Sequence, residues 1–368
     1  MQLARETETF IREVPKAEYH LHFEGAFRWQ TIKAVHPRGR SLPETPPWWR
    51  NKILTFRDFE KIFADYILPA TGTPELIERH MYEVLSDLAA QRVRYVEISF
   101  SLHFHSGRGL EIEEILQAVQ RGKTAAESTY DITVRIIAGL SRRRSEDNVL
   151  DLLQRAISVR TTEGRNIVDG VDLYGDERLG LPEVFVKAFA LAKGAGIRLK
   201  AHAGEFCGSE SILQVMNTLN VQDISHGVRA CESRELIEKI VCRGIYLHLC
   251  PSSNVCLGIS PSISSHPFRT LFDAGCQVTI NTDDPLIFRS NLTNEIGLIA
   301  KFQGFSVSEL ASVCNAAFNN ALMSSASLDV IRNSINELAE DCCAYEGQNM
   351  VSHGSYRSPP DSTDRVHR

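Results

Sequence analysis

The chain has 368 residues, of which 43% are hydrophobic and 23% charged, and its formal net charge is −6. This composition is typical of a folded globular protein, and the acidic balance provides no basic field for nucleic acid. No stretch reaches the roughly eighteen apolar residues of a membrane helix, and no secretory apolar segment begins the chain. Its nine cysteines lack the regular spacing of a disulfide framework. We therefore expect a cytoplasmic protein with reduced thiols that is associated with no membrane.

Short apolar runs rich in β-branched residues recur along the chain, and helical patterns separate them. The expected strands are 18–22, 93–101, 132–140, 167–174, 197–202, 223–226, 245–250 and 277–283. Several are almost continuously apolar, which indicates parallel strands covered on both faces. Among the expected helices, 181–196 has Pro182 just inside its start, and 233–244 has Ser233 as its N-cap. Eight strand–helix units predict an α/β fold, namely a (β/α)8 TIM barrel.

Two regions fall outside this alternation. Residues 28–83 are too long for a single crossover helix, and they contain an aromatic amphipathic stretch at 56–63. We expect a lid-like helical insertion after strand 1, although the periodicity also fits a helix packed on the core. The end of the chain is rich in Ser, Pro, Gly, His and Asp. We therefore expect one barrel domain at 1–344 and a disordered tail at 345–368.

Histidine and aspartate residues gather where the expected strands end. His20 and His22 stand one residue apart, so on a strand both imidazoles would face the same side. An isolated pair of this kind also fits an exposed edge strand or a loop. Three further strand ends carry His202, His226 and Asp283. Each alone fits a structural role, but barrel enzymes place their reactive residues at this rim, and four coincidences there are improbable.

These residue types predict a metal site with an acid beside it. The imidazoles of His20, His22 and His202 and the carboxylate of Asp283 suit one zinc ion per chain. Zinc would leave a position for water and lower the pKa of that water from about 15.7 toward about 7. Glu205 follows His202 by three residues and could act as a general acid and base without ligating the metal. His226 could then orient the attacking hydroxide, and Asp284 could bind substrate.

The motifs at these strand ends closely resemble those of the adenosine deaminase family, which are zinc-dependent purine aminohydrolases. The matching stretches are collinear, and they are 15–26, 173–177, 202–205, 225–227, 250–254 and 282–286. The resemblance implies the hydrolytic loss of ammonia from C6 of an adenine ring. It also implies zinc ligands at His20, His22, His202 and Asp283. Glu205 matches the residue that protonates purine N1, and His226 matches the histidine that assists the attack.

Substrate contacts follow from the same resemblance. Asp284 would lie by ring N7 and Gly175 by ring N3, and Phe59 and Phe63 belong to a stretch that resembles the lid helix over the base. Glu24 stands where adenosine deaminases usually have an Asp that contacts the ribose, whereas adenine deaminases and some relatives have Glu. Adenosine or a related adenine nucleoside is therefore the expected substrate, and free adenine is the alternative.

Two other functions fit a barrel of this kind. A two-metal hydrolase commonly needs a bridging lysine at the end of strand 4, and the stretch 167–174 contains none. A non-catalytic binding barrel would have damaged ligands or a damaged acid, and all of these are present. A cytidine-deaminase type of site is excluded because its Pro-Cys-x-x-Cys pair is absent. We expect a small purine as the binding partner, and the oligomeric state stays open.

Overall fold

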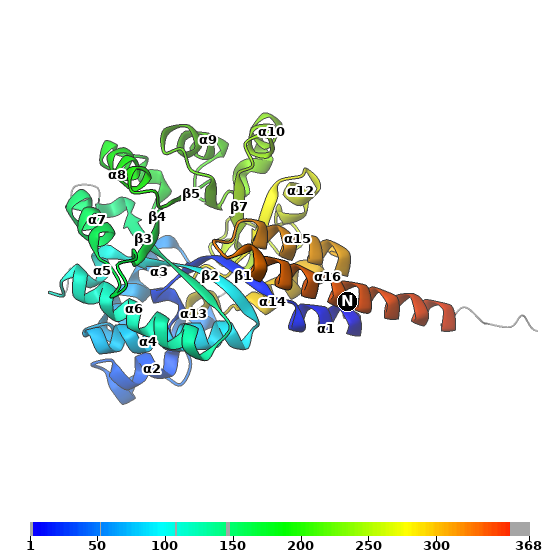
Figure 1. Cartoon of the computed structure of the whole chain (residues 1–368), viewed down its shortest axis with the longest axis horizontal. Coiled ribbons are helices and arrows are strands. Elements are labelled where there is room, and N and C mark those ends of the chain that lie inside the picture. The colour runs from blue at the N-terminus through cyan, green and yellow to red at the C-terminus, as the bar shows by residue number, and fades with distance from the viewer. Residues whose placement is uncertain (1–2, 52, 107–108, 145–147, 354–368) are drawn as a thin grey trace, which may run out of the picture.

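Eight parallel strands follow one another in chain order around a barrel, with helices outside them (Figure 1). The computed structural model describes residues 3–51, 53–106, 109–144 and 148–353. The strands are β1 (Lys16–His22), β2 (Val93–Ser101), β3 (Thr133–Ser141), β4 (Val168–Tyr174), β5 (Arg198–Ala203), β6 (Asp223–His226), β7 (Tyr246–Leu249) and β8 (Gln277–Ile280). All eight match the expected runs within a few residues, which confirms the (β/α)8 barrel.

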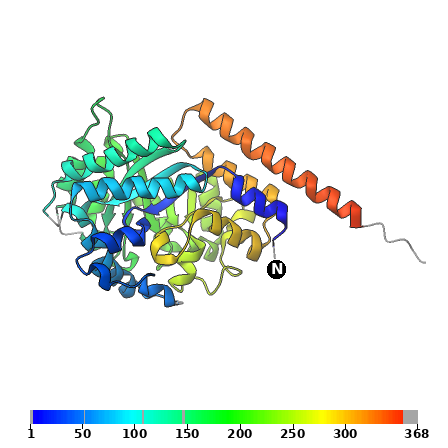
Figure 2. The same cartoon turned by 90° about the horizontal axis from the view of Figure 1, so that it is seen from below.

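The helices between the strands cover the outside of the barrel (Figure 2). The main ones are α4 (Pro74–Ala90), α6 (Ile112–Thr129), α7 (Val149–Ser158), α8 (Glu183–Gly194), α9 (Ser209–Thr218), α10 (Arg234–Cys242), α12 (Phe268–Asp273), α14 (Leu292–Gln303) and α15 (Val307–Asn319). Shorter ones are α5 (Leu102–Ser106), α11 (Pro251–Cys256) and α13 (Pro285–Phe288). The expected N-cap of α10 is present, because the Ser233 hydroxyl accepts the N–H of Leu236 at 3.2 Å.

The segment after β8 joins the last strand to the first. The side-chain oxygen of Asn281 accepts the backbone N–H groups of Tyr19 and His20, at 2.8 and 3.2 Å. The N–H of Asp283 donates to the carbonyl of His20 at 2.8 Å, and the N–H of His22 donates to the carbonyl of Asp283 at 2.9 Å. This closure places Asp283 directly beside the two histidines of β1.

A helical insertion separates β1 from α4, as expected. Its helices are α2 (Trp29–Val35) and α3 (Phe56–Ile62), and a π-helical turn, η4 (Phe63–Ile67), continues α3. Trp29, Trp48 and Tyr66 form a cluster of ring contacts at its centre. The insertion therefore has packing of its own, and α3 begins at a capping box between Thr55 and Asp58.

The first and last helices of the described chain pack together beside the barrel. Helix α1 (Arg5–Glu13) packs on α16 (Ser325–His353), which also packs on α15. Helix α16 reaches beyond residue 344, so the expected tail begins within this helix, and 354–368 lie outside the described residues. In the described part of the chain, no helix is long and apolar enough to cross a membrane, and the nine cysteines are free thiols.

Candidate active site

The strand ends bring the expected metal ligands into one cluster. The Nε2 atom of His22 lies 3.2 Å from Nε2 of His202 and 3.3 Å from Oδ1 of Asp283. His20 Nε2 also lies 3.3 Å from Oδ1 of Asp283. The ring of His226 is 4.5 Å from that of His20, measured between centroids. Residues that stand more than 260 positions apart in the chain therefore meet at the carboxyl rim of the barrel.

The backbone is strained at two of these residues. His226 and Asp283 have φ angles of 65° and 64°, in the left-handed region that residues other than glycine rarely adopt. Such a conformation costs about 1–3 kcal/mol, and it is often found at functional sites. At both positions the chain turns off the strand end, and the turn carries the side chain into the cluster.

The cluster suits a zinc ion. The Nδ1–H of His20 donates to the carbonyl of His248 at 3.3 Å, and the Nδ1–H of His202 donates to Oδ1 of Asp172 at 3.2 Å. In both neutral rings the Nε2 atom therefore carries no proton, and its lone pair is free to bind a metal ion. Within the described residues, Nε2 of His20 is buried and forms no hydrogen bond. Burial lowers the pKa of His22 to about 3 and also lowers that of His202, so their rings are neutral. Converging neutral nitrogens beside a carboxylate repel one another unless a cation lies between them.

Three further residues lie within reach of a metal ion there, and one of them is Asp284, whose carboxylate forms a group with His22 and Asp283. Nitrogen atoms of His20, His202 and His226 lie within 4.8 Å of one another, and Sγ of Cys250 belongs to a similar group with His20 and Asp283. Burial raises the pKa of the Cys250 thiol well above its ordinary value, which disfavours the thiolate form that binds a metal. The ligand set named from the sequence remains a prediction.

A second layer of polar residues holds these side chains, and sequence reasoning missed it. Asp172 of β4 orients His202, and the Ser253 hydroxyl donates to Oδ2 of Asp283 at 2.6 Å. Such partners fix ring orientation and increase the basicity of a ligand. The signals in the sequence were the acidic residues within the apolar run of β4, which also fit ordinary buried ion pairs, and the matching stretch 250–254, which contains Ser253.

Glu205 and His226 face each other beside the cluster. Glu205 Oε1 lies 3.4 Å from Nε2 of His226, and the Glu205 side chain is buried. Burial raises the pKa of Glu205 well above its ordinary value, and the charges of Asp283 and Glu177 raise it further. Because Asn254 Nδ2 donates to Nδ1 of His226 at 3.2 Å, the neutral imidazole carries its proton on Nε2. The Glu205 carboxyl therefore lies beside an imidazole N–H, in surroundings that favour its protonated form.

A cavity of about 230 Å³ opens above these residues. Its floor consists of imidazoles and carboxylates, and its roof consists of aromatic rings from the insertion and neighbouring loops: Phe56, Phe59, Phe63, Phe104 and Phe206. All the residues expected to contact substrate line it, namely Glu24, Phe59, Phe63, Gly175 and Asp284. An aromatic roof over a polar floor suits a planar ring with nitrogen atoms along its edge.

Glycines shape two sides of this cavity. A Cβ atom on Gly25 would lie 1.7 Å from Oδ1 of Asp284, so only glycine lets that carboxylate occupy its place. This Oδ1 atom is buried and has no hydrogen-bond partner among the described residues. Gly175 has a φ of 94°, which also requires glycine. Glu24 is fixed by two hydrogen bonds of 2.9 Å to its Oε1, from the N–H of Ser101 and Nε2 of His105.

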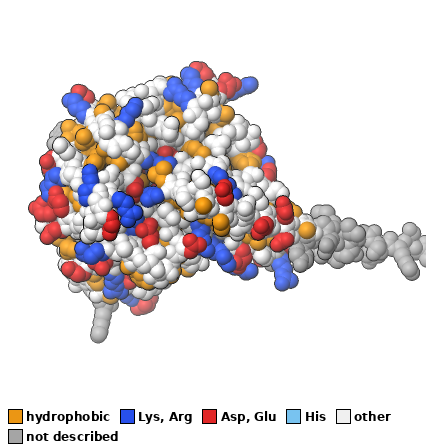
Figure 3. Space-filling view, in the orientation of Figure 1, with side chains coloured by type: hydrophobic (Ala, Val, Ile, Leu, Met, Phe, Trp, Pro, Cys, Tyr) orange, Lys and Arg blue, Asp and Glu red, His pale blue; other side chains and the backbone are white. Residues whose placement is uncertain are grey.

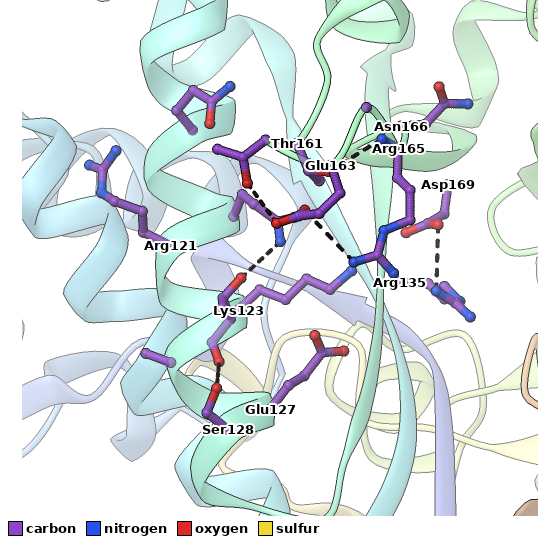
Figure 4. Close-up of a pocket in the computed structure, with 16 residues that line it drawn as sticks. Arg121, Lys123, Glu127, Ser128, Arg135, Thr161, Glu163, Arg165, Asn166 and Asp169 are labelled. Carbon is purple, nitrogen blue, oxygen red and sulfur yellow. Dashed lines mark hydrogen bonds and ion pairs between the residues drawn. The ribbon is translucent and has the colours of Figure 1, made fainter.

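A larger hollow of about 1010 Å³ lies elsewhere, between α6 and the turn at 161–166 (Figure 4). Several of its charged residues are paired: Arg121 pairs with Glu78 at 2.6 Å, and Arg135 lies 3.8 Å from Asp169. Basic and acidic side chains are interspersed over the face in Figure 3. This hollow holds none of the expected catalytic residues, so the smaller cavity at the strand ends is the candidate active site.

The barrel and its polar rim define a hydrolase with a candidate metal site. The family model for adenosine deaminase matches residues 15–338, so the chain belongs to the adenosine deaminase family and is a deaminase.

An adenosine deaminase of Clostridium botulinum (strain Okra / Type B1) is 28% identical over 337 residues, covering 89% of this chain and 99% of that protein. An adenine deaminase of Mesorhizobium japonicum is 32% identical over 311 residues, covering 84% and 94%. The crystal structure of adenine deaminase from Arthrobacter aurescens superposes with a TM-score of 0.80 at 26% identity, covering 89% and 99%.

Proposed function

We propose that the protein hydrolyses the amino group from C6 of adenosine or a related adenine nucleoside, giving the inosine-type product and ammonia. The observation that carries this proposal is the pair of Glu205 and His226, 3.4 Å apart, beside three imidazoles and a carboxylate in an aromatic-roofed cavity. A proton donor, a group that orients water and a candidate metal site then all face one planar ligand.

His20, His22, His202 and Asp283 would hold one zinc ion per chain. Zinc bound there would lower the pKa of a coordinated water from about 15.7 toward about 7. The Nε2–H of His226 points to Glu205 and Asp283, where it can hold the oxygen that attacks C6.

Glu205 supplies the proton that activates the ring. Its buried carboxyl gives a proton to N1, which draws electrons from C6 and makes attack by water easier. Water then adds to C6 as the C6–O bond forms, and one of its protons goes to the amino group, which leaves as ammonia when the C6–N bond breaks. The other proton returns to the Glu205 carboxylate, while the proton given to N1 stays in the product. Gly175 lies by N3 and Asp284 by N7, so the ring edge is held at two points, while Phe59 and Phe63 exclude bulk water.

Free adenine is a second candidate, and the small volume of the cavity is the observation that favours it. Both hydrogen bonds to Glu24 fall on Oε1, which leaves the other oxygen to accept a donor from the ligand. Either a ribose hydroxyl or the N9–H of the free base could supply that donor. The cavity is smaller than the roughly 300–1,000 Å³ of sites for drug-sized ligands, which favours a compact ligand.

Ammonia release from a panel of substrates tests both candidates. Zinc-loaded protein should release ammonia from adenosine, deoxyadenosine or adenine, and the ratio of kcat/KM values identifies the substrate. AMP should be a poorer substrate, because its phosphate would approach the carboxylate of Glu24. Release from adenine in large excess over adenosine would favour the second candidate. No release from any member of the panel would overturn both.

A further inference from the structure

Four consecutive backbone N–H groups around Glu205 point to a single carboxylate. Oε1 of Glu177 accepts the N–H of Gly204 at 2.6 Å. Oε2 accepts the N–H groups of Glu205, Phe206 and Cys207 at 3.0, 2.8 and 3.0 Å. Hydrogen bonds to an ionised group are roughly twice as strong as those between neutral groups. The segment that carries Glu205 is therefore attached to Glu177 along its whole length.

Glu177 lies where a second segment leaves the barrel. It begins the short helix η7 (Glu177–Leu179) just after β4, and it is buried, with 4% of its surface exposed. Arg142 ties the same two segments together from the other side. Its guanidinium donates to the carbonyl of Gly180 at 2.6 Å and to that of His202 at 2.7 Å. A buried cation therefore accompanies the buried carboxylate, as an ionised interior group requires.

The Glu205 side chain has little else to fix it. Its one close polar neighbour in the described residues is Nε2 of His226 at 3.4 Å, which is longer than an ordinary hydrogen bond. Its direction therefore depends on the backbone at 204–207. Gly204 turns that backbone with a φ of 66°, and a Cβ atom there would lie 2.4 Å from Ile212 Cδ1. The turn is thus closely packed on one side and held by Glu177 on the other.

We propose that Glu177 is a positioning residue that holds Glu205 in line with the substrate through the backbone N–H groups of 204–207. This proposal rests on the proposed function, because it assigns Glu205 the proton transfer. Glu177 is not among the residues that line the cavity, so it acts without touching substrate. Its charge has a second effect. Burial raises the pKa of Glu205 most, and the negative charges of Asp283, Glu177 and Asp176 raise it further, in that order. His226 of β6 faces the same carboxyl.

Hydrogen exchange and kinetics of Glu177→Gln test this role in the full-length, zinc-loaded protein. The matched control is Glu183→Gln, an exposed glutamate of α8 that pairs only with Lys187 among the described residues. Amides in the 203–208 peptide should exchange at least about tenfold faster in Glu177→Gln and at the wild-type rate in the control. The kcat should fall about 100-fold with KM and zinc content little changed, because misplacement of a reacting group costs roughly that much.

The pH profile separates positioning from simple loss of structure. Removal of the negative charge at 177 lowers the pKa of Glu205, so the basic limb of kcat/KM should move to lower pH. Glu177→Asp keeps the charge on a shorter side chain, and it should give an intermediate kcat with the basic limb unmoved. It also tests the proposal if Glu177→Gln does not fold. Unchanged exchange at 203–208, or an unchanged kcat in both variants, would overturn the role of Glu177. An inactive wild type would instead overturn the proposed function. The exchange measurement would still test whether Glu177 holds the backbone at 204–207.

Discussion

Oε1 of Glu205 lies 3.4 Å from Nε2 of His226, and both side chains are buried at the carboxyl rim of the barrel. One is a carboxyl whose pKa is raised by burial, and the other is an imidazole whose pKa burial lowers well below its usual value. Burial therefore favours the uncharged form of both groups, and in that form each carries one proton that it can donate in a hydrogen bond.

Loss of the acid should abolish the reaction without loss of the metal. We expect Glu205→Gln to lower kcat by about 100- to 10,000-fold, because the amide cannot supply a proton to N1. Zinc content and the midpoint of thermal unfolding should stay near the wild-type values, since Glu205 ligates nothing in this account. Steady-state kinetics and elemental analysis of the same preparation measure both. Wild-type turnover in Glu205→Gln would exclude it as the proton donor.

The carboxylate behind His202 should control metal affinity. Asp172→Asn keeps the shape of the side chain but weakens its hold on Nδ1 of His202. We expect zinc to bind about 10- to 100-fold more weakly, as is usual for such outer partners, and a competing chelator reports the change. The control is Asp131→Asn, an exposed aspartate that pairs with Arg94. Equal zinc affinity in both variants would show that Asp172 does not support a ligand.

An ion pair should hold the lid over the cavity. Arg143 donates to Oε2 of Glu60 at 2.8 Å, which joins the end of β3 to α3, and both residues line the cavity. Because Arg143 is about half exposed, we expect Arg143→Ala to change stability by less than about 1 kcal/mol. KM should rise several-fold, since α3 carries Phe59 over the substrate. Lys61→Ala, which removes an exposed pair on the same helix, should leave KM unchanged.

Glu24 should determine the preference between nucleoside and base. Glu24→Asp shortens the side chain by one methylene and withdraws its carboxylate from Ser101 and His105. We expect the ratio of kcat/KM for adenosine over adenine to rise, because space opens on the ribose side. Competition between the two substrates in one reaction measures that ratio directly. A fall in the ratio would mean that Glu24 contacts the ribose itself.

Acid should destabilise the fold through buried neutral histidines. Burial lowers the pKa of His80 from 6.5 to about 4, so the unfolded chain binds a proton more readily than the folded one over that interval. The contribution of neutral His80 to the free energy of unfolding is complete above about pH 6.5 and is lost as the pH falls toward about 4. His80→Phe keeps the stack on Phe27 and removes the titrating group. Between about pH 7.5 and 5.5, His80→Phe should lose about 1 kcal/mol less free energy of unfolding than the wild type, as measured by urea titration. An equal loss in both proteins would show that His80 is not responsible for the acid sensitivity.

The sequence predicted the strands well, because buried parallel strands are recognisable as apolar runs. The residues named at the strand ends also lie close together, because the strand order brings those ends to one rim, and their roles stay a prediction. Asp283 was expected on strand 8, but β8 ends at Ile280 and Asp283 lies on the closing segment beside β1. That arrangement depends on Asn281 and on hydrogen bonds to residues more than 260 positions away, which no local pattern encodes.

Roles that act through the backbone were not predictable either. Glu177 follows Gly175 and Asp176 in a matched motif, but four of its hydrogen-bond partners are backbone N–H groups, which every residue except proline has, and the fifth is the Ser211 hydroxyl. The start of the tail was placed by composition at 345. Helix α16 extends to His353, and the tail expected at 345–368 stays a prediction.

The most direct test of the central claim is the reaction itself in isotopically labelled water. The zinc-loaded protein should convert adenosine or adenine to a product that carries the water oxygen at C6, with one ammonia released for each product. Glu205→Gln in parallel should show neither. Labelled product with unchanged yield in Glu205→Gln, or no product from any adenine-containing substrate, would contradict the account.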